Sequence, residues 1–215
     1  DKYEWISDVD SKNYKRTSMG IVMKRRDNAP IVKYVYGNMI EKIMVERNYE
    51  KTLKWLKKTL RDICRGTFHV NYFIISKSLN GFYKNPESIA HKVLADRIGI
   101  RDPGNKPKAN DRIPYLYIEV QEREHIGYEK IRKRVRNGFY KNGNEKFKIV
   151  IEQGKPKYRK RHIVPGERIE SPDYVLEKGL KIDYRYYISN QIMNPVIQVL
   201  DLYDKNNDNS EIFNV

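Results

Sequence analysis

The sequence predicts an α+β fold that is mainly helical, with short strands and a basic β-hairpin insertion. Three observations support this prediction. Apolar residues recur at helical spacing in several segments that are bounded by capping residues and glycines. Short runs of β-branched and aromatic residues stand between these segments. A stretch rich in lysine and arginine, at residues 121–170, contains Asn-Gly dipeptides that are typical of turns.

The first two predicted helices lie in the N-terminal third, after a short strand at residues 20–26. Asn28 is expected to cap the first helix, with Pro30 in its first turn, where the missing N–H costs nothing. The second helix is expected to begin at Asn48 and to end at Gly66. Its apolar stripe is Leu53, Leu56, Leu60 and Ile63. The opposite face carries lysines and arginines, and it is either an ordinary solvated face or a surface that contacts phosphates.

In the middle of the chain, the residue pattern predicts two strands and one helix. Residues 73–75 form a short apolar run, and Asn85 followed by Pro86 is a typical helix start. Residues 113–120 are expected to form a strand in which Tyr115 and Tyr117 alternate with an apolar residue. One face of this strand would then be buried, and the other would be a packing or stacking surface.

The last third predicts the basic hairpin and two helices. Residues 147–152 and 155–161 are expected to be its strands, joined by a turn at Gln153-Gly154. A short helix should run from Ser171 to Gly179. A final helix should begin at the capping residue Asp183, and Pro195 should kink it.

The chain has 215 residues, 39% of them hydrophobic and 12% aromatic, which is enough to bury a core. Its net charge is +15, and residues 171–215 are slightly acidic, so the positive charge lies on residues 1–170. This charge favours a polyanion as partner, the alternative being a merely soluble basic surface. No apolar run approaches the ~20 residues that span a bilayer, and residues 1–10 lack a leader core. We therefore expect no membrane partner and an intracellular location.

Motifs for catalysis are mostly absent. No phosphate-binding loop, dinucleotide-binding glycine pattern or paired-histidine zinc motif is found, and the four histidines are scattered. The single cysteine, Cys64, excludes an internal disulfide and is expected to be a buried thiol. Asp8 and Asp10 have the i, i+2 spacing of carboxylates that hold Mg²⁺ ions, but the same residues favour a polar turn.

Several blocks of sequence resemble family B DNA polymerases of the delta type. Residues 20–32, Gly-Ile-Val-Met-Lys-Arg-Arg-Asp-Asn-Ala-Pro-Ile-Val, look like the segment that leads from the palm to the thumb of these enzymes. Blocks similar to the family's thumb follow in the family's order at residues 73–79, 83–86, 91–98, 101–115 and 172–192. The resemblance covers nearly the whole chain except residues 121–168, and the longer connection there favours an enzyme of large-DNA-virus type.

The resemblance implies a division of the chain, which would be a C-terminal piece of the polymerase. Residues 1–30 would be the end of the palm and the palm–thumb junction, and residues 31–120 would be the thumb core. Residues 121–170 would be a basic insertion, and residues 171–215 would form C-terminal thumb helices.

The resemblance also implies that the catalytic centre lies elsewhere. In this family the catalytic aspartates precede the thumb by many residues, whereas Asp8 and Asp10 stand close to Gly20. We therefore reject both as metal ligands and expect no catalytic or metal-binding residue here. The Mg²⁺ of the whole enzyme would bind outside this chain, and the chain alone would be inactive.

The implied function is to grip primer–template duplex DNA through its phosphates and so to support template-directed nucleotidyl transfer in replication. The expected DNA-binding residues are Lys24, Arg25, Arg26, Asn28, Lys77, Lys84, His91 and Arg112. For residues 24–26 the alternative is an ion-pair cluster with Asp27. The implied protein partners are the palm, fingers and exonuclease parts of the polymerase. A sliding clamp is a further candidate, although no clamp-binding peptide is found. The enzyme would work in the host nucleus or in a cytoplasmic viral factory.

Two functions of other classes stay open from the residues alone. A basic RNA-binding or assembly protein without catalysis would use residues 121–168 as its arm, and competition between structured RNA and primed DNA would separate it from a polymerase part. A metal nuclease would use Asp8 and Asp10, and its cleavage would be lost in an Asp10→Ala variant.

Overall fold

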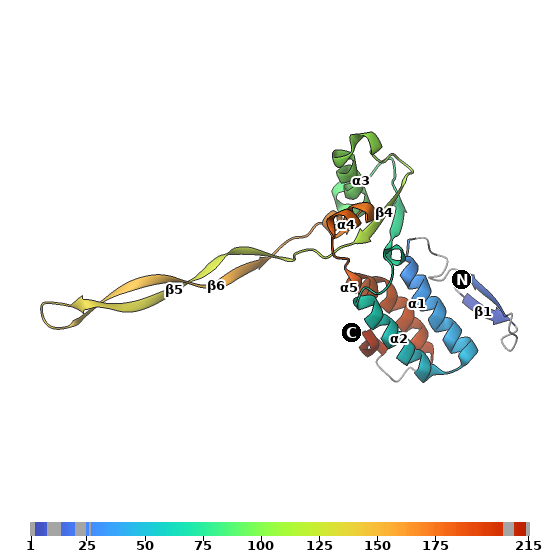
Figure 1. Ribbon diagram of the computed structural model, residues 1–215, viewed down its shortest axis with the longest axis horizontal. Coiled ribbons are helices and arrows are strands. Elements are labelled where there is room, and N and C mark those ends of the chain that lie inside the picture. Colours follow the sequence, from blue (N-terminus) through green and yellow to red (C-terminus); the bar gives the residue numbers. More distant parts are fainter. Residues whose placement is uncertain (1–2, 8–13, 20–24, 26, 204–208, 214–215) are drawn as a thin grey trace. The chain divides into compact units, whose positions relative to one another are not determined.

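The computed structural model describes residues 3–7, 14–19, 25, 27–203 and 209–213. The chain divides into two compact units, residues 1–119 with 164–215 and residues 120–163 (Figure 1). Helices and small antiparallel sheets make up the first unit, so the α+β class predicted from the sequence is confirmed. Within the described ranges, no helix has both the length and the apolar character needed to cross a membrane.

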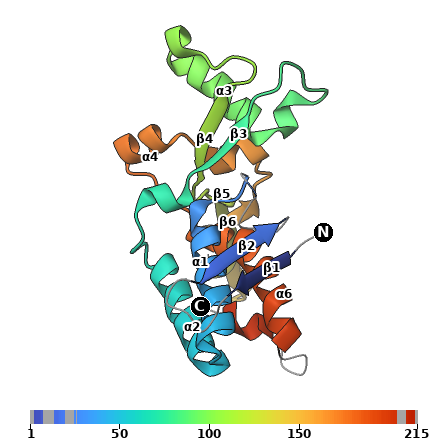
Figure 2. The ribbon, with the colours of Figure 1, turned by 90° about the vertical axis from the view of Figure 1, so that its right-hand side faces the viewer.

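Three helices pack together in the first unit, namely α1 (Pro30–Glu41), α2 (Tyr49–Cys64) and α6 (Met193–Tyr203) (Figure 2). A π-helical turn at Lys42–Glu46 extends α1. A second one, Tyr187–Ile192, joins the short α5 (Tyr184–Tyr186) to α6. A 3₁₀ helix, Asn209–Phe213, packs on α2 and α6. Their fully buried side chains form the core between them: Ile31, Val35, Met39, Leu56, Leu60, Ile192 and Val196.

The predicted cap and stop of α2 are confirmed. The Asn48 side chain accepts a hydrogen bond from the backbone N–H of Lys51 at 2.9 Å, which satisfies one of the free donors at the helix start. Gly66 follows the helix with a φ of +68°, a conformation that glycine adopts without strain. Leu56, Leu60 and Ile63 are fully buried, as their spacing predicts.

A three-stranded antiparallel sheet has the order β3 (Ile75–Ser78), β4 (Arg112–Tyr117) and β7 (Ile169–Glu170). Helix α3 (Ala90–Arg101) packs against β4 and β7, and α4 (Pro172–Lys178) packs against β4. Strands β1 (Tyr3–Ser7) and β2 (Lys15–Met19) pair as a separate antiparallel ribbon. Short 3₁₀ turns occupy Val70–Phe73, Pro86–Ser88, Pro103–Asn105 and Pro165–Arg168.

Tyr187 ties the helices to this sheet. Its ring is fully buried and meets the ring of Phe73 edge to face, with centroids 5.1 Å apart. Its hydroxyl donates a hydrogen bond to the carbonyl oxygen of Phe73 at 2.7 Å and accepts one from the backbone N–H of Tyr117 at 3.0 Å. Both bonds satisfy backbone groups that lie beyond the reach of the sheet's own hydrogen bonds.

The second unit is a long two-stranded antiparallel ribbon made of β5 (Arg123–Phe139) and β6 (Glu145–Lys160). Residues 140–144 connect the strands, with Gly143 at a φ of +82°. The pairing shifts at three places, between His125 and Gly127, between Tyr128 and Lys130, and between Arg136 and Phe139.

Two predicted helix starts are wrong. The N-cap of α1 is Ala29 and not Asn28, and the backbone N–H of Ala29 donates to Oε1 of Gln191, 3.2 Å away. The second, after Asn85, is a single 3₁₀ turn because Ile89 has an extended backbone, and α3 begins only at Ala90.

Three strand predictions also need correction. The turn expected at Gln153-Gly154 lies inside the continuous strand β6, at a shift in pairing. The strand expected at residues 73–75 begins only at Ile75, because the preceding residues form a 3₁₀ turn. Tyr115 is buried together with its neighbour Leu116, so both faces of β4 are covered at these two residues, whereas Arg112 and Pro114 on the face of Leu116 are exposed. The strand expected at residues 20–26 falls mostly outside the described residues.

Pro195 lies in the first turn of α6, directly after the π-helical segment Tyr187–Ile192. Proline has no N–H to donate to the preceding turn, and the wider π-helical turn stands where that bond is missing. The irregularity predicted at this position is therefore a change of helix type.

Candidate nucleic-acid interface

An open hollow of about 420 Å³ lies beside the paired strands β3 and β4. Three of the predicted DNA-binding residues line it, namely Lys77, His91 and Arg112, and Asp27 lies at its border. Asp27 precedes α1, Lys77 belongs to β3, His91 to the first turn of α3 and Arg112 to β4. The antiparallel pairing of Ser78 with Arg112 sets Arg112 beside the two serines of β3, and Lys77, which stands between these serines in the strand, also lines the hollow.

Arg112 is held against β3 by three hydrogen bonds. Its Nε donates to Oγ of Ser76 at 2.8 Å, its Nη1 to Oγ of Ser78 at 3.3 Å, and its Nη2 to the carbonyl oxygen of Ser76 at 2.7 Å. A guanidinium has five N–H donors, so one N–H on each terminal nitrogen is left over. The group is exposed and fixed in orientation, which suits it to donate hydrogen bonds to a phosphate oxygen.

Two further cations differ in their pairing. Within the described part of the chain no carboxylate forms an ion pair with Lys77, which is exposed. Arg25 forms a two-pronged ion pair with Asp27, with distances of 3.1 Å from Nε to Oδ1 and 2.8 Å from Nη2 to Oδ2. The hydrogen bond from Arg25 is the main cause of a lowered pKa of Asp27, which keeps this carboxylate charged. For Arg25 the ion pair with Asp27 that the sequence left open is therefore present.

His91 is a hydrogen-bond partner of a tyrosine in this hollow. Its Nε2 lies 3.0 Å from the hydroxyl of Tyr83, and that hydroxyl also accepts the backbone N–H of Asn80 at 2.7 Å. Burial, followed by the charge of Lys77, lowers the pKa of His91, against a hydrogen bond to the backbone of Ser78. The neutral imidazole is thus favoured near neutral pH, and His91 shapes the hollow more than it adds charge to it.

The remaining predicted residues lie elsewhere. Lys24 and Arg26, like Asp8 and Asp10, are outside the described residues. Asn28 is half-buried in the segment before α1, and Lys84 is exposed on the loop between β3 and the following 3₁₀ turn, outside the hollow's lining. No three His, Cys, Asp or Glu side chains gather into a metal-binding group in the ranges that the structure covers.

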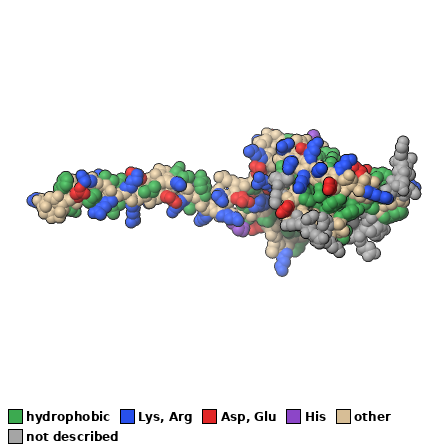
Figure 3. Space-filling view, turned by 90° about the horizontal axis from the view of Figure 1, so that it is seen from below, with side chains coloured by type: hydrophobic (Ala, Val, Ile, Leu, Met, Phe, Trp, Pro, Cys, Tyr) green, Lys and Arg blue, Asp and Glu red, His purple; other side chains and the backbone are tan. Residues whose placement is uncertain are grey.

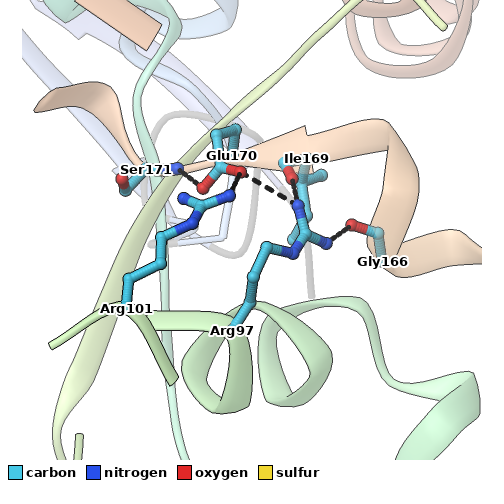
Figure 4. A network of polar contacts seen from close by, with 6 residues as sticks. All are labelled: Arg97, Arg101, Gly166, Ile169, Glu170 and Ser171. Atoms are coloured by element: carbon cyan, nitrogen blue, oxygen red, sulfur yellow. Dashed lines mark hydrogen bonds and ion pairs between the residues drawn. The ribbon is translucent and has the colours of Figure 1, made fainter. Parts of the chain in front are cut away.

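One network near this site was not predicted from the sequence (Figure 4). Glu170 of β7 is 2% exposed, and its Oε2 accepts hydrogen bonds from Arg97 and Arg101 of α3, both at 2.9 Å. The backbone N–H of Ser171 donates to its Oε1 at 2.9 Å. Arg97 also donates to the carbonyl oxygens of Gly166 and Ile169. The network fastens α3, which carries His91, to the sheet. Its partners stand about 70 positions apart, so no local pattern could have indicated it.

The family model of DNA polymerase family B matches residues 2–203, which is nearly the whole chain. The chain belongs to this family. The resemblance drawn from the sequence is thereby confirmed.

Known relatives are viral and cellular polymerases. A DNA polymerase of Acanthamoeba polyphaga mimivirus is 43% identical over 92% of this chain and 9% of its own length. A DNA polymerase of Pyramimonas orientalis virus is 38% identical over 90% of this chain and 13% of its own. The DNA polymerase delta catalytic subunit of Caenorhabditis elegans is 27% identical over 85% of this chain and 13% of its own. The chain thus spans about a tenth of the length of these relatives.

Among solved structures, the family B DNA polymerase of the archaeon Pyrobaculum calidifontis has a similar fold. The TM-score is 0.54 at 15% identity, and the match covers 89% of this chain and 20% of that one. At this identity the likeness concerns the fold alone.

Proposed function

We propose that this chain is the end of the palm and the thumb of a family B DNA polymerase, and that it grips primer–template duplex DNA. In the whole enzyme this grip would support template-directed nucleotidyl transfer during replication. The grip is independent of sequence, because it is made with phosphates and not with base edges.

The hollow beside β3 and β4 carries this proposal. Its lining contains the fixed, exposed guanidinium of Arg112 and also Lys77, which has no carboxylate partner among the described residues. Two cations held at one open surface form a phosphate-binding patch, and the two serines beside them add hydroxyl donors. The proposed DNA contacts also include Arg25, Asn28, Lys84 and His91, and Lys24 and Arg26 outside the described residues.

The chemistry of nucleotide addition belongs, in this proposal, to other parts of the polymerase. The described residues offer no group of acidic or histidine side chains that fits a Mg²⁺ ion. The metal of the whole enzyme would be held by palm residues upstream, and the palm, fingers and exonuclease parts would be the protein partners. The isolated chain with Mg²⁺ and nucleotides should therefore add no nucleotide to a primer.

Binding of the chain to primer–template duplex over a salt series tests the proposal. The logarithm of the affinity should fall linearly with the logarithm of the salt concentration between ~50 and ~200 mM. Lys77→Gln and Arg112→Gln should each reduce that slope by about 1, because each removes one phosphate contact. The matched control is Lys54→Gln, which removes another exposed lysine, on α2 and outside the lining of the hollow.

Two results would contradict the proposal. One is the absence of duplex binding at ~50 mM salt, where phosphate contacts are strongest. The other is an equal loss for Lys54→Gln, which would mean that overall charge alone drives binding. Membership of the polymerase family does not favour the alternative of an RNA-binding or assembly protein. Binding of structured RNA in preference to primed DNA would support that alternative.

A further inference from the structure

The ribbon of β5 and β6 carries positive charge in a regular arrangement. Alternate residues of a strand point to the same face, and directly paired residues of antiparallel strands share a face. The register pairs Lys130 with Gln153, Arg132 with Ile151, Arg134 with Ile149, and Arg136 with Phe147. Four cations of β5 therefore lie in one row, about 6.6 Å apart, opposite uncharged residues of β6. We call this the cationic face.

Most of the cations on the cationic face form no ion pair with a carboxylate of the ribbon. Arg136 is paired with Glu145 near the turn. For Lys130, Arg132 and Arg134 the structure, which describes every residue of the ribbon, gives no ion pair to a carboxylate. The opposite face carries three cations as well, Lys133, Lys146 and Lys148, and Lys133 is paired with Glu152 at 2.5 Å. On the cationic face the three cations without an ion pair follow one another in a single row on one strand.

Exposed apolar side chains accompany these cations. Ile149 and Ile151, directly opposite Arg134 and Arg132, are 68% and 59% exposed. Figure 3 shows blue lysine and arginine side chains and green apolar ones along the ribbon. A two-stranded ribbon has no core of its own, and exposed apolar groups beside a row of cations are typical of a surface that meets a partner.

We propose that the cationic face is a second contact surface for duplex DNA. Lys130, Arg132 and Arg134 would contact phosphates, and the ribbon has the width that the major groove of B-DNA admits. The ribbon would thereby add its own phosphate contacts to those of the first unit. This inference rests on the proposed function for its choice of DNA as ligand.

The duplex suits this face better than a single strand. Surfaces that bind single strands without sequence preference offer open aromatic rings on which bases stack. Beside the three cations without an ion pair, the nearest ring, Phe147, is covered by the guanidinium of Arg134 at 4.1 Å from its centroid. The side chains directly opposite these cations are Ile149, Ile151 and Gln153, which offer no ring. The exposed rings of Tyr128 and Phe139 lie beyond the two ends of this row. At the cations themselves the favoured chemistry is therefore phosphate contact.

Two triple variants of the whole chain test the proposal. In the first, Lys130, Arg132 and Arg134 are each changed to Gln. In the second, Lys133, Lys146 and Lys148 are changed to Gln, which removes the same charge without touching the cationic face. Binding to a mixed-sequence duplex and to one of its single strands is measured by fluorescence anisotropy over a salt series. A third variant, with Arg132→Lys and Arg134→Lys, keeps the charge and controls for damage to the ribbon.

The first variant should reduce the salt slope for duplex by about 2.7, and the second by less than about 1, because three phosphate contacts are lost only in the first. The charge-keeping variant should bind like the parent chain. Equal losses in the two triple variants would overturn the inference, and so would a loss confined to the single strand. If the parent chain does not bind duplex, the proposed function fails as well. If Lys77→Gln weakens binding and the first triple variant does not, only this inference fails.

Discussion

Removing the carboxylate of Glu170 should destabilise the first unit more than any surface charge change. In Glu170→Ala, two arginines lose their shared partner, and the backbone N–H of Ser171 loses its acceptor. Breaking a buried ion pair by removing one partner costs about 3–5 kcal/mol when the remaining charge stays buried.

The structure indicates that Glu170→Ala costs less than about 3–5 kcal/mol. The side chains of Arg97 and Arg101 are 27% and 34% exposed, so water can reach both after the change. Arg97 keeps its two carbonyl acceptors, and Arg101 keeps its stacking on the ring of Tyr174, 3.6 Å from the centroid. We therefore expect a loss of about 2–3 kcal/mol in the free energy of unfolding. For a chain of this size that is a fall in Tm of roughly 4–12 °C.

The pH dependence of the free energy of unfolding tests the same network independently. Burial alone would raise the pKa of Glu170, but the hydrogen bonds from Arg101 and Ser171 and the charges of both arginines outweigh it and hold the pKa below its usual value. A carboxyl whose folded-state pKa is lowered contributes stability above its unfolded pKa and loses it as the pH falls through the folded value. The parent chain should thus lose more stability than Glu170→Gln as the pH falls from neutral to below ~4.3, the ordinary pKa of Glu.

Urea unfolding followed by circular dichroism at neutral pH and at lower pH measures both effects. The matched control is Glu177→Ala, since Glu177 is 64% exposed and forms a surface pair with Lys178, worth less than about 1 kcal/mol. A triple change of Glu170, Arg97 and Arg101 to apolar residues should recover part of the loss. If Glu170→Ala costs no more than Glu177→Ala, the reasoning about this network is refuted.

Two further stability changes follow from buried contacts. Tyr187→Phe should lower the free energy of unfolding by about 2–3 kcal/mol, because two backbone groups lose their hydrogen-bond partner. Tyr203→Phe, at an exposed position, is the control and should leave Tm unchanged. Equal Tm values for the two variants would contradict this reasoning. Gly66→Ala should cost more than the ~1 kcal/mol of left-handed strain, because its Cβ would lie 2.9 Å from the hydroxyl of Tyr184. Gly179→Ala has a similar φ and open space, so urea midpoints that are alike for both would contradict the steric argument.

Features with local causes were predictable from the sequence. The start, stripe and end of α2 depend on Asn48, on apolar spacing and on Gly66, all within the helix or next to it. Asp183 likewise caps its helix, and Gly179 ends α4 in the left-handed conformation. Such signals act within a few residues, so they can be recognised in the sequence without the tertiary fold.

Errors arose where a residue serves a distant contact. Gly154 is not in a turn, because its position in β6 faces the Ile131 side chain across the ribbon, where an added Cβ would come within 2.8 Å. The true connection, at residues 140–144, holds Asn142-Gly143, one of the two Asn-Gly dipeptides in the basic stretch that are typical of turns. Glycine permits both a turn and a close approach, and spacing alone does not separate the two.

The candidate site shows the same limit. Lys77, His91 and Arg112 each come from a separate block of the family resemblance, and only the folded chain, with β3 paired to β4 and α3 beside them, places all three around one hollow. The hydrogen bonds that fix Arg112, and the neutral state of His91, depend on partners that only the folded chain supplies. The residue types were therefore predictable, but their roles were not.

The pairing of β4 with β7 has a consequence for how this chain tolerates change. Leu116 and Glu170 are direct neighbours across the two strands, so the residues that lead into and out of residues 120–163 start about 5 Å apart. Strand ends this close can be joined by a tight turn or by a long excursion, since the entropy of closing a loop grows only with the logarithm of its length. The position is thus a natural entry point at which evolution, or a protein engineer, can add, exchange or remove a module while the sheet stays intact.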